Sequence, residues 1–373
     1  MKNIVITGAS GFVGKNLVWD LSTDDSINIL EINRNTDENT KQEYLKTGDI
    51  IIHLAGVNRP KNPDEFYKGN VNFLEEMLET IKSNEKKPPI LFSSSIQVTK
   101  SNEYGDSKYQ AEEKLKNFSK ENGNEIYIYR LPNLFGKWCK PNYNSVIATF
   151  CHNIARNKEI TINDSRTILK LNYIDDVIQE FKNVIFNQVK SKEETYFVPN
   201  VYEKSLGEIV DLLKSFKETR NNRTLPKLDN DFEKKLYSTY LSYIPKDEFN
   251  YPLKMNIDER GSFTEFIKTP DRGQVSVNIS KPGITKGNHW HHTKNEKFLV
   301  VSGKGVIRFR LPFDSEIIEY FVSGEKLEVI DIPVGYTHNI ENLGDKDMVT
   351  IMWVNEMFNP DVPDTYFLEV NNE

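Results

Sequence analysis

A chain of 373 residues exceeds what one hydrophobic core comfortably serves, and its 38% hydrophobic and 28% charged residues exclude extensive disorder. The formal net charge of −7 argues against a nucleic-acid partner, and no apolar run approaches the ~20 residues that cross a bilayer. Two cysteines, Cys139 and Cys151, are too few for a disulfide framework, and the first residues lack the sections of a signal peptide. We therefore expect a two-domain protein in the reducing cytoplasm.

The beginning of the chain is predicted to form a strand, a glycine turn, a helix and a second strand. Residues 4–6 lead into Thr7-Gly-Ala-Ser-Gly-Phe-Val-Gly14, a helical segment extends to about Leu21, and the second strand covers residues 27–30. Glycines at such a turn let backbone amides approach a pyrophosphate, and the helix N-terminus offers it unpaired N–H groups. The residues of this turn that we expect to contact a dinucleotide are Gly8, Ser10, Gly11, Phe12, Val13 and Gly14.

The residues after the second strand bear on the choice of nicotinamide cofactor. Glu31 would hold the ribose 2′-hydroxyl of NAD, whereas Arg34, just beyond it, would pair with the 2′-phosphate of NADP. Arg34 stands in the better position for its role. We therefore expect NADPH, with Glu31 as the residue that would favour NADH instead.

A tyrosine and a lysine four residues apart follow a buried-strand run that ends in three serines. Residues 89–92 continue into Ser93-Ser-Ser95, at a strand end of the kind where α/β proteins build their sites. On a helix Tyr104 and Lys108 share a face, so the ammonium can lie near the phenol and lower its pKa. Such a phenol can exchange a proton with a carbonyl or an alcohol, although many ordinary helices contain the same pair.

Together these pieces resemble the extended short-chain dehydrogenase/reductase (SDR) family over roughly residues 1–240. The matching motifs are Thr7 to Gly14, His53-Leu-Ala-Gly56, Ser93-Ser-Ser95, Tyr104 to Lys108, Arg130-Leu-Pro-Asn-Leu-Phe-Gly136 and Tyr173-Ile-Asp-Asp-Val177. The resemblance implies a Rossmann-like α/β domain in which Ser95 is the catalytic hydroxyl, Tyr104 the acid/base, and Lys108 its activator and ribose anchor. Further implied contacts are Leu54, Ala55, Gly56, Tyr104 and Lys108 with the cofactor and Asn133 with a nucleotide sugar, while Asn70 is structural or near the site.

The residues that follow the three serines indicate which reaction of the family the chain catalyses. Nine positions separate Ser95 from Tyr104, fewer than is usual in the family, so the substrate loop is shortened and Ser93 and Ser94 remain alternative catalytic serines. A 4,6-dehydratase of this family usually carries an Asp-Glu pair after the catalytic hydroxyl. Ser95 is followed by Ile96-Gln97 instead, which favours simple reduction.

A polar, charged segment marks the junction between the domains. Residues 214–230 precede a helix-like stretch over 231–243, and Pro245 and Pro252 bracket the crossing into the second domain. We place the boundary so that residues 1–245 form the SDR domain. Residues 246–373 then form the second domain.

Four candidate metal ligands lie in two short stretches near the C-terminus: His289, His291, Glu296 and His338. In a strand, alternate side chains share a face, so His289 and His291 point the same way and His292 the other way. Four of the chain's six histidines fall inside the two stretches, a clustering that a purely structural use of histidine does not explain. Three imidazoles and one carboxylate suit zinc or another divalent first-row metal.

The two stretches resemble the paired motifs of the cupin barrel. The pattern G-x5-H-x-H-x4-E-x6-G matches residues 283–303, and P-x-G-x2-H-x3-N matches residues 333–342. Leu327 stands where a glycine usually opens the second motif, and short β-rich runs separated by turn residues flank both stretches. The resemblance implies a small all-β cupin barrel over roughly residues 252–373, in which the four candidates hold one divalent metal per chain, with zinc expected.

An SDR half joined to a metal-type cupin half is similar, over essentially the whole chain, to bifunctional enzymes of capsular polysaccharide synthesis. The resemblance implies that the barrel epimerises C3 of a UDP-linked 2-acetamido-2,6-dideoxy-4-hexulose and that the SDR half then reduces the C4 ketone with NADPH. The product would be UDP-2-acetamido-2,6-dideoxy-L-talose, on the route to UDP-N-acetyl-L-fucosamine. A cation beside the developing oxyanion would stabilise an enolate, or the metal would be a structural ion at the barrel mouth.

Two other functions remain open from the residues. One is a single-activity SDR reductase or dehydratase whose barrel only binds a ligand or stabilises a dimer, and the other is a non-enzymatic sensor of nucleotide sugars. Ser95, Tyr104 and Lys108 together argue against the sensor. We expect a UDP-linked 4-keto amino sugar as the substrate, no nucleic-acid or membrane partner, and a homodimer.

Overall fold

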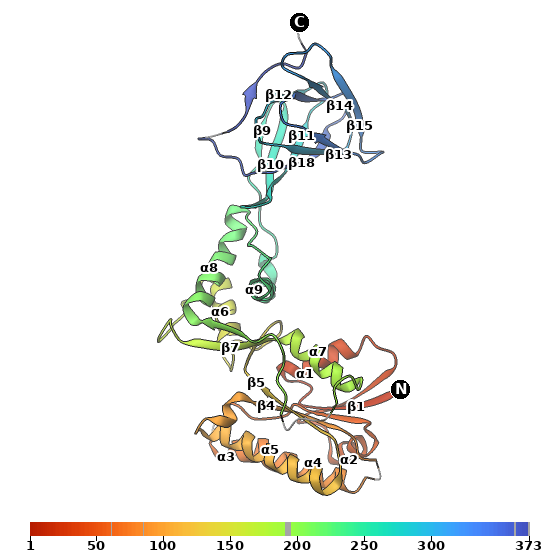
Figure 1. Cartoon of the computed structure of the whole chain (residues 1–373), viewed down its shortest axis with the longest axis vertical. Helices are drawn as coiled ribbons and strands as arrows, with labels where there is room; N and C mark the ends of the chain where they lie inside the picture. Colours follow the sequence, from red (N-terminus) through yellow and green to blue (C-terminus); the bar gives the residue numbers. More distant parts are fainter. Residues whose placement is uncertain (61, 85, 191–194, 362, 372–373) are drawn as a thin grey trace. The chain divides into compact units, whose positions relative to one another are not determined.

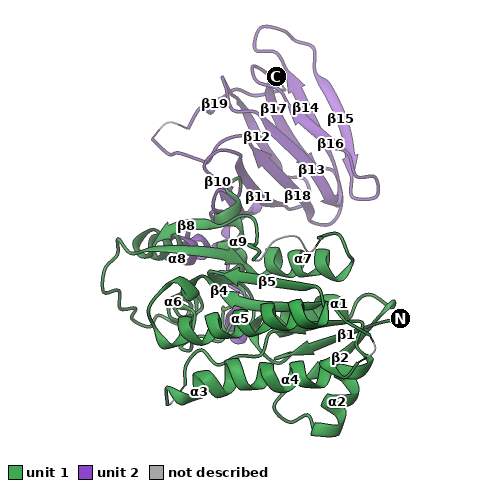
Figure 2. Cartoon of the chain, turned by 60° about the horizontal axis from the view of Figure 1, so that its bottom comes forward, with its two compact units in different colours: residues 1–214, 229–245 green, residues 215–228, 246–373 purple. Residues whose placement is uncertain are grey.

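The structure is a computed structural model that describes residues 1–60, 62–84, 86–190, 195–361 and 363–371. The chain divides into two compact units (Figure 2), residues 1–214 with 229–245 and residues 215–228 with 246–373. Residues 215–228, which lie within the predicted first domain, group with the second unit. None of the helices in these described ranges is long and apolar enough to cross a membrane.

The first unit is built on a five-stranded parallel sheet with the order β2-β1-β3-β4-β5 (Figure 1). Its strands are β1 (Lys2–Thr7), β2 (Ile27–Ile32), β3 (Ile50–His53), β4 (Ile90–Ser95) and β5 (Ile126–Leu131). All four residues of β3 are buried, as expected where helices cover both faces of a parallel sheet. The strand order reverses between β1 and β3, and ligands of such sheets bind at the carboxyl ends of the strands at this point.

Helices pack on both faces of this sheet. One face carries α1 (Phe12–Leu21) and α7 (Ile174–Ile185), and the other carries α2 (Glu38–Thr47), α4 (Phe73–Lys82) and α5 (Glu103–Asn122). Alternate side chains of β1 pack on opposite faces of the sheet: Ile4 and Ile6 belong to the core cluster of the first face, and Val5 belongs to that of the second. The remaining elements before residue 246 are α3 (Asp64–Tyr67), a π-helical turn η1 (Lys68–Asn72), a 3₁₀ turn η2 (Ile96–Thr99), α6 (Val146–Ala155), α8 (Leu206–Asn222), α9 (Asp231–Leu241) and the small sheet of β6 (Asn133–Phe135), β7 (Ile168–Tyr173) and β8 (Tyr202–Ser205).

The second unit, beyond the 3₁₀ turn η3 (Lys246–Glu248), consists of two antiparallel sheets with the orders β16-β13-β18-β11-β10-β9 and β15-β14-β17-β12-β19. The strands are β9 (Asn256–Asp258), β10 (Gly261–Thr269), β11 (Gly273–Ser280), β12 (Thr285–Trp290), β13 (Glu296–Ser302), β14 (Lys304–Arg310), β15 (Ile318–Ser323), β16 (Val329–Ile332), β17 (Thr337–Asn342), β18 (Met348–Val354) and β19 (Tyr366–Phe367). Phe298 and Met348 from the first sheet and Ile307, Phe309 and Ile340 from the second share one buried core. The predicted fold class, a Rossmann-like α/β domain followed by an all-β cupin-like domain, is confirmed.

Candidate active sites

The glycine turn after β1 brings backbone segments into close approach at the carboxyl end of the strands. Gly8 has a φ of 70°, and a Cβ there would lie 2.7 Å from the amide nitrogen of Ala55. A Cβ at Gly14 would lie 2.3 Å from the carbonyl oxygen of Gly8. Helix α1 begins at Phe12 with Gly11 as its N-cap, so the N–H groups of its first turn lie at the carboxyl end of β1. Only glycines permit this packing, which suits a diphosphate at the helix N-terminus.

The other predicted cofactor residues lie around the same turn. Ser10 is exposed, and Phe12 and Val13 are half-buried. The backbone N–H of Leu54 donates to the carbonyl of Thr7 at 3.1 Å, and that of Ala55 donates to the Thr7 hydroxyl at 3.2 Å. These bonds hold the segment after β3 beside the glycine turn.

Arg34 is exposed in a turn directly after β2. The turn is fixed because the N–H of Asn33 donates to the Thr36 hydroxyl at 3.0 Å. The N–H of Gly8 donates to the carbonyl of Ile32 at 3.0 Å, which joins the end of β2 to the glycine turn. A guanidinium at this point can pair with a 2′-phosphate on a ribose bound beside the turn.

Replacing Arg34 by alanine should weaken NADPH binding by roughly 10–100-fold and change NADH binding little. Only NADPH carries the phosphate, and one charge-assisted hydrogen bond contributes about 1.5–3 kcal/mol. Titration of both cofactors by fluorescence gives the two dissociation constants, with Lys46→Ala, an exposed lysine of α2, as the charge control. Equal losses for NADPH and NADH would move cofactor selection to Glu31.

Ser95 and Tyr104 meet where β4 ends and α5 begins. Ser95 caps the 3₁₀ turn η2, its hydroxyl accepting the N–H of Gln97 at 3.2 Å. Gly105 packs so closely on this turn that a Cβ would lie 2.2 Å from the carbonyl oxygen of Gln97. Tyr104, in the first turn of α5, is thereby held with its phenol next to the Ser95 side chain.

The three serines at the end of β4 have different partners. The hydroxyl of Ser93 donates to the carbonyl of His53 at 3.3 Å. The hydroxyl of Ser94 donates to the fully buried carboxylate of Glu112 at 2.5 Å. Ser95, by contrast, faces the phenol of Tyr104. Of the three candidates that the sequence left open, Ser95 is the one that the structure brings next to the tyrosine.

Lys108 is buried one turn beyond Tyr104. Its Nζ donates to the carbonyl of Ser93 at 3.0 Å, and burial lowers the pKa of the lysine to about 8, with Glu112 counteracting. Burial raises the pKa of Tyr104, and the hydrogen bond from Ser95 opposes the increase. The expected lowering of the phenol pKa is therefore wrong. The phenol is held in the protonated form, which is the form that donates a proton.

Asn70 joins the predicted cofactor segment to α5. Its Oδ1 accepts the N–H of Val57 at 2.7 Å, and its Nδ2 donates to the carbonyl of Val57 at 3.0 Å and to the Ser107 hydroxyl at 2.9 Å. A Cβ at Gly56 would lie 2.9 Å from Asn70 Oδ1 and 3.2 Å from Lys108 Nζ. Asn70 therefore positions both the segment after β3 and the helix that carries the lysine.

A buried ion pair behind the serines was missed by sequence reasoning. The Glu112 carboxylate accepts from Arg130 Nε at 3.0 Å and from Arg130 Nη2 at 2.6 Å. The same carboxylate receives the hydroxyl of Ser94. The sequence did contain a hint of this pair, because Glu112 lies four residues after Lys108 on the same helix and Arg130 is the first residue of the family motif over residues 130–136. The pair ties β4 and β5 to α5.

Asn133 lies at the start of β6 with its side chain exposed. Its Nδ2 donates to the carbonyl of Lys170 on β7 at 3.3 Å, which limits the freedom of the amide. The contact with a nucleotide sugar stays a prediction for this residue.

The four predicted metal ligands converge inside the second unit. His289 lies on β12, Glu296 begins β13, His338 lies on β17, and His291 directly follows β12. One ligand atom from each lies within 4.8 Å of all the others. The Glu296 Oε2 atom is 3.1 Å from His338 Nε2 and 3.6 Å from His291 Nε2. The structure therefore brings the four predicted side chains together, and their role as metal ligands stays a prediction.

Burial and hydrogen bonding at this cluster fit a divalent cation. His291 is 3% exposed, and its Nε2 has no hydrogen-bond partner among the described residues. Burial alone would raise the pKa of Glu296, but contacts with His291 and His338 outweigh it and lower the pKa to about 2. Burial, reinforced by His338, lowers the pKa of His289 to about 4. Neutral imidazoles and a carboxylate are the forms that bind zinc.

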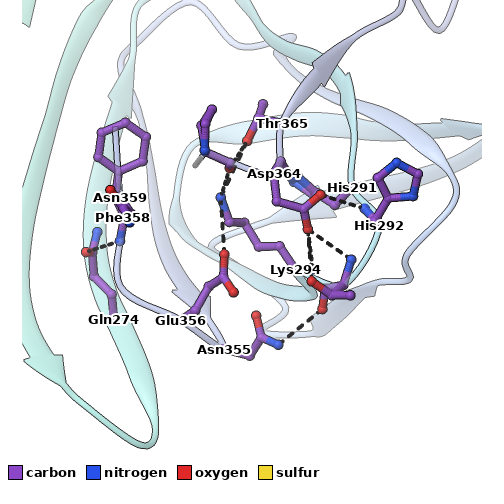
Figure 3. A network of polar contacts seen from close by, with 12 residues as sticks. Gln274, His291, His292, Lys294, Asn355, Glu356, Phe358, Asn359, Asp364 and Thr365 are labelled. Carbon is purple, nitrogen blue, oxygen red and sulfur yellow. Dashed lines mark hydrogen bonds and ion pairs between the residues drawn. The ribbon is translucent and has the colours of Figure 1, made fainter. Parts of the chain in front are cut away.

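Asp364, near the C-terminus, fixes the loop of residues 292–294, which directly follows the ligand His291 (Figure 3). The Asp364 carboxylate accepts the backbone N–H groups of His292 at 3.0 Å, Thr293 at 2.9 Å and Lys294 at 3.0 Å. The Asp364 carbonyl lies 2.6 Å from Nδ1 of His291, so an N–H there turns Nε2 toward the other ligands. No spacing in the sequence pointed to Asp364.

Asp364→Ala should weaken metal binding by about 10–100-fold, the usual effect of losing a group that orients a ligand. The loop of residues 292–294 loses the acceptor that fixes it, so His291 is held less firmly. Competition with a chromophoric chelator measures the affinity, and Asp361→Ala, an exposed aspartate of the same segment, is the control. An unchanged affinity in Asp364→Ala would show that the loop is fixed by other contacts.

The metal-ligand cluster lines a cavity of about 550 Å³ in the second unit. His289, Glu296 and His338 form part of its wall, together with charged and apolar side chains. A volume of this size suits a small-molecule ligand such as a sugar.

Comparison with known proteins finds a family match in each unit. Residues 4–198 match the NAD dependent epimerase/dehydratase family, and residues 256–366 match the polysaccharide biosynthesis C-terminal domain. The UDP-2-acetamido-2,6-beta-L-arabino-hexul-4-ose reductase of Pseudomonas aeruginosa is 42% identical over 367 residues, which are 98% of each chain.

Solved structures give the same assignment. The capsular polysaccharide assembling protein CapF from Staphylococcus aureus has 65% sequence identity and a TM-score of 0.93, covering 99% of this chain and 100% of that chain. The UDP-N-acetylglucosamine 4-epimerase from Methanobrevibacter ruminantium is 19% identical with a TM-score of 0.55, covering 65% of this chain and 98% of that chain, and shares only the fold. The predicted similarity to two-domain proteins of capsular polysaccharide synthesis is confirmed, and the chain belongs to the NAD dependent epimerase/dehydratase family, in the two-domain form that it shares with CapF.

Proposed function

We propose that the chain carries out two consecutive steps on a UDP-linked 2-acetamido-2,6-dideoxy-4-hexulose. The second unit inverts C3, and the first unit then reduces the C4 ketone with NADPH. The observation that carries this proposal is the presence, in one chain, of the Ser95–Tyr104–Lys108 arrangement and a buried metal-ligand cluster on a cavity. The names of the P. aeruginosa reductase and of S. aureus CapF support the substrate class and the place in capsular polysaccharide synthesis.

The reduction uses the side chains at the carboxyl end of β4. NADPH, when bound, supplies the hydride for C4. Tyr104 donates its phenolic proton to the ketone oxygen, and its raised pKa keeps that proton in place until the oxygen takes up charge. Ser95, next to the phenol, orients the same oxygen, and Lys108, held by the Ser93 carbonyl, anchors the ribose.

The inversion at C3 uses the cavity of the second unit. A divalent metal, expected to be zinc, would be held by His289, His291, Glu296 and His338 and would supply positive charge near the ketone oxygen. The ketone at C4 acidifies the C3 proton, so inversion precedes reduction. The product of the two steps is UDP-2-acetamido-2,6-dideoxy-L-talose, a precursor of UDP-N-acetyl-L-fucosamine.

Two incubations of the full-length protein with the keto sugar test the proposal. In D₂O without NADPH, NMR should show deuterium entering C3. With NADPH deuterated at the transferred position, mass spectrometry and NMR should find the label at C4 of the product. NADPH oxidation without any exchange at C3 would leave a single-activity reductase whose barrel is structural or binds a ligand.

A further inference from the structure

A β-bulge in β12 places a lysine in the cavity that the metal ligands line. The register between β12 and β17 shifts between Gly287 and His289, where Asn288 has a φ of 58°. Asn288 is fixed there because its Oδ1 accepts from Asn339 Nδ2 at 2.9 Å. In an unbroken strand Lys286 and His289 would point to opposite faces, but the extra residue lets both line the same cavity.

Two neutral acceptors hold the Lys286 side chain. Its Nζ donates to Asn278 Oδ1 and to the carbonyl of Ile279, both at 2.8 Å. Asn278 is itself 1% exposed, and its Nδ2 donates to the Ser280 hydroxyl at 3.1 Å, which fixes the amide. One tetrahedral position on Nζ remains, and it carries a proton in the ammonium and a lone pair in the amine. The lysine therefore offers one exchangeable proton position in the cavity.

The carboxylates of the cavity wall, Asp258 and Glu296, already have partners. The Asp258 carboxylate accepts from Arg260 Nη2 at 2.6 Å and Nε at 3.1 Å, and this pairing holds the pKa of Asp258 below its usual range. Glu296 belongs to the metal-ligand cluster. Burial lowers the pKa of Lys286; the charge of Asp258 opposes this shift and the charge of Arg260 adds to it. The neutral amine therefore forms more readily than in an exposed lysine.

We propose that Lys286 is the residue that exchanges the C3 proton in the epimerisation, an inference that rests on the proposed function. The Lys286 amine takes the proton from C3, the C–H electron pair becomes the C3–C4 double bond, and the carbonyl π pair moves onto the ketone oxygen. Water then protonates C3 from the opposite face as the carbonyl re-forms. The ammonium returns its proton to the resulting hydroxide, so the step needs no oxidant, reductant or further reactant.

Two substitutions in the full-length protein separate proton transfer from fixed charge. In D₂O without NADPH, Lys286→Met should slow deuterium entry at C3 of the keto sugar by at least about 100-fold, the usual contribution of a positioned acid–base group. Lys286→Arg should be equally slow, because a guanidinium keeps its proton at neutral pH. Both variants should keep their metal content and should reduce the already inverted keto sugar with NADPH at the wild-type rate.

The controls make each outcome decisive. Lys326→Met removes a lysine whose side chain is 76% exposed in the same unit and should exchange C3 normally. Wild-type exchange in Lys286→Met overturns the assignment, and so does recovery in Lys286→Arg, which would show that the lysine supplies only positive charge. If Lys286→Met loses metal or thermal stability, the rate of C3 exchange in Lys286→Arg, measured on protein with normal metal content, decides whether the lysine transfers the proton. Wild-type protein that exchanges no C3 proton would defeat the proposed epimerisation itself, which is a different failure.

Discussion

Tyr104→Phe should lower the rate of NADPH oxidation by at least about 1,000-fold and leave the exchange of the C3 proton at the wild-type rate. The substitution removes the proton donor to the ketone oxygen but keeps the ring that packs against Phe66. The metal-ligand cluster lies in the other unit and contains none of the residues around Tyr104. Absorbance at 340 nm follows the reduction, and NMR in D₂O without NADPH follows the exchange.

A matched control lies on the same helix. Tyr109, five residues further along α5, is 48% exposed, and Tyr109→Phe should leave both rates unchanged. If Tyr104→Phe still oxidised NADPH at the wild-type rate, Tyr104 would not be the proton donor and the site after β4 would need another acid.

His338→Asn should have the opposite effect to Tyr104→Phe: C3 exchange should be lost and reduction should be kept. Losing one of four ligands should release the metal and reduce C3 exchange by at least about 100-fold, because the charge beside the ketone oxygen contributes several kcal/mol to the proton removal. NADPH-dependent reduction of the already inverted keto sugar should continue. Elemental analysis gives the metal content, and the two assays used for Tyr104→Phe give the activities.

His292→Gln is the matched control for the ligand variant. His292 is exposed and makes edge-to-face contacts with Trp290 and Tyr366, with ring centroids 4.5 and 5.0 Å away, so its loss should leave metal content and both rates unchanged. Metal-free His338→Asn with full C3 exchange would remove the metal from the chemistry. A general loss of folding, measured by thermal unfolding, would leave it as a structural ion.

The parts of the site that sequence could predict are those built from local patterns. The glycine turn, the Tyr104/Lys108 pair and the ligands His289 and His291, on β12 and directly after it, each lie within a few residues of one another, where spacing indicates which side chains share a face. Glu296 and His338 came from the resemblance to a family motif. The fold class likewise came from the two family resemblances, with which the predicted strands and helices agreed.

The parts that sequence could not predict depend on contacts between distant segments or on a break in periodicity. Asp364 fixes a loop about 70 residues earlier in the chain. The bulge at Asn288 reverses the faces that strict alternation assigns, so Lys286 could not be placed in the cavity. The pKa of Tyr104 was predicted in the wrong direction because burial, which the sequence does not give, raises it and outweighs the opposing effect of the Ser95 hydroxyl.

The division of labour between the two units can be tested in a single product analysis. The full-length protein is incubated with the UDP-linked 4-keto sugar and unlabelled NADPH in D₂O, and the isolated product is examined by NMR. The account predicts one product that carries deuterium at C3 with the inverted configuration and protium at C4. A product with protium and the original configuration at C3 would contradict it, because reduction would then have occurred without the inversion assigned to the second unit.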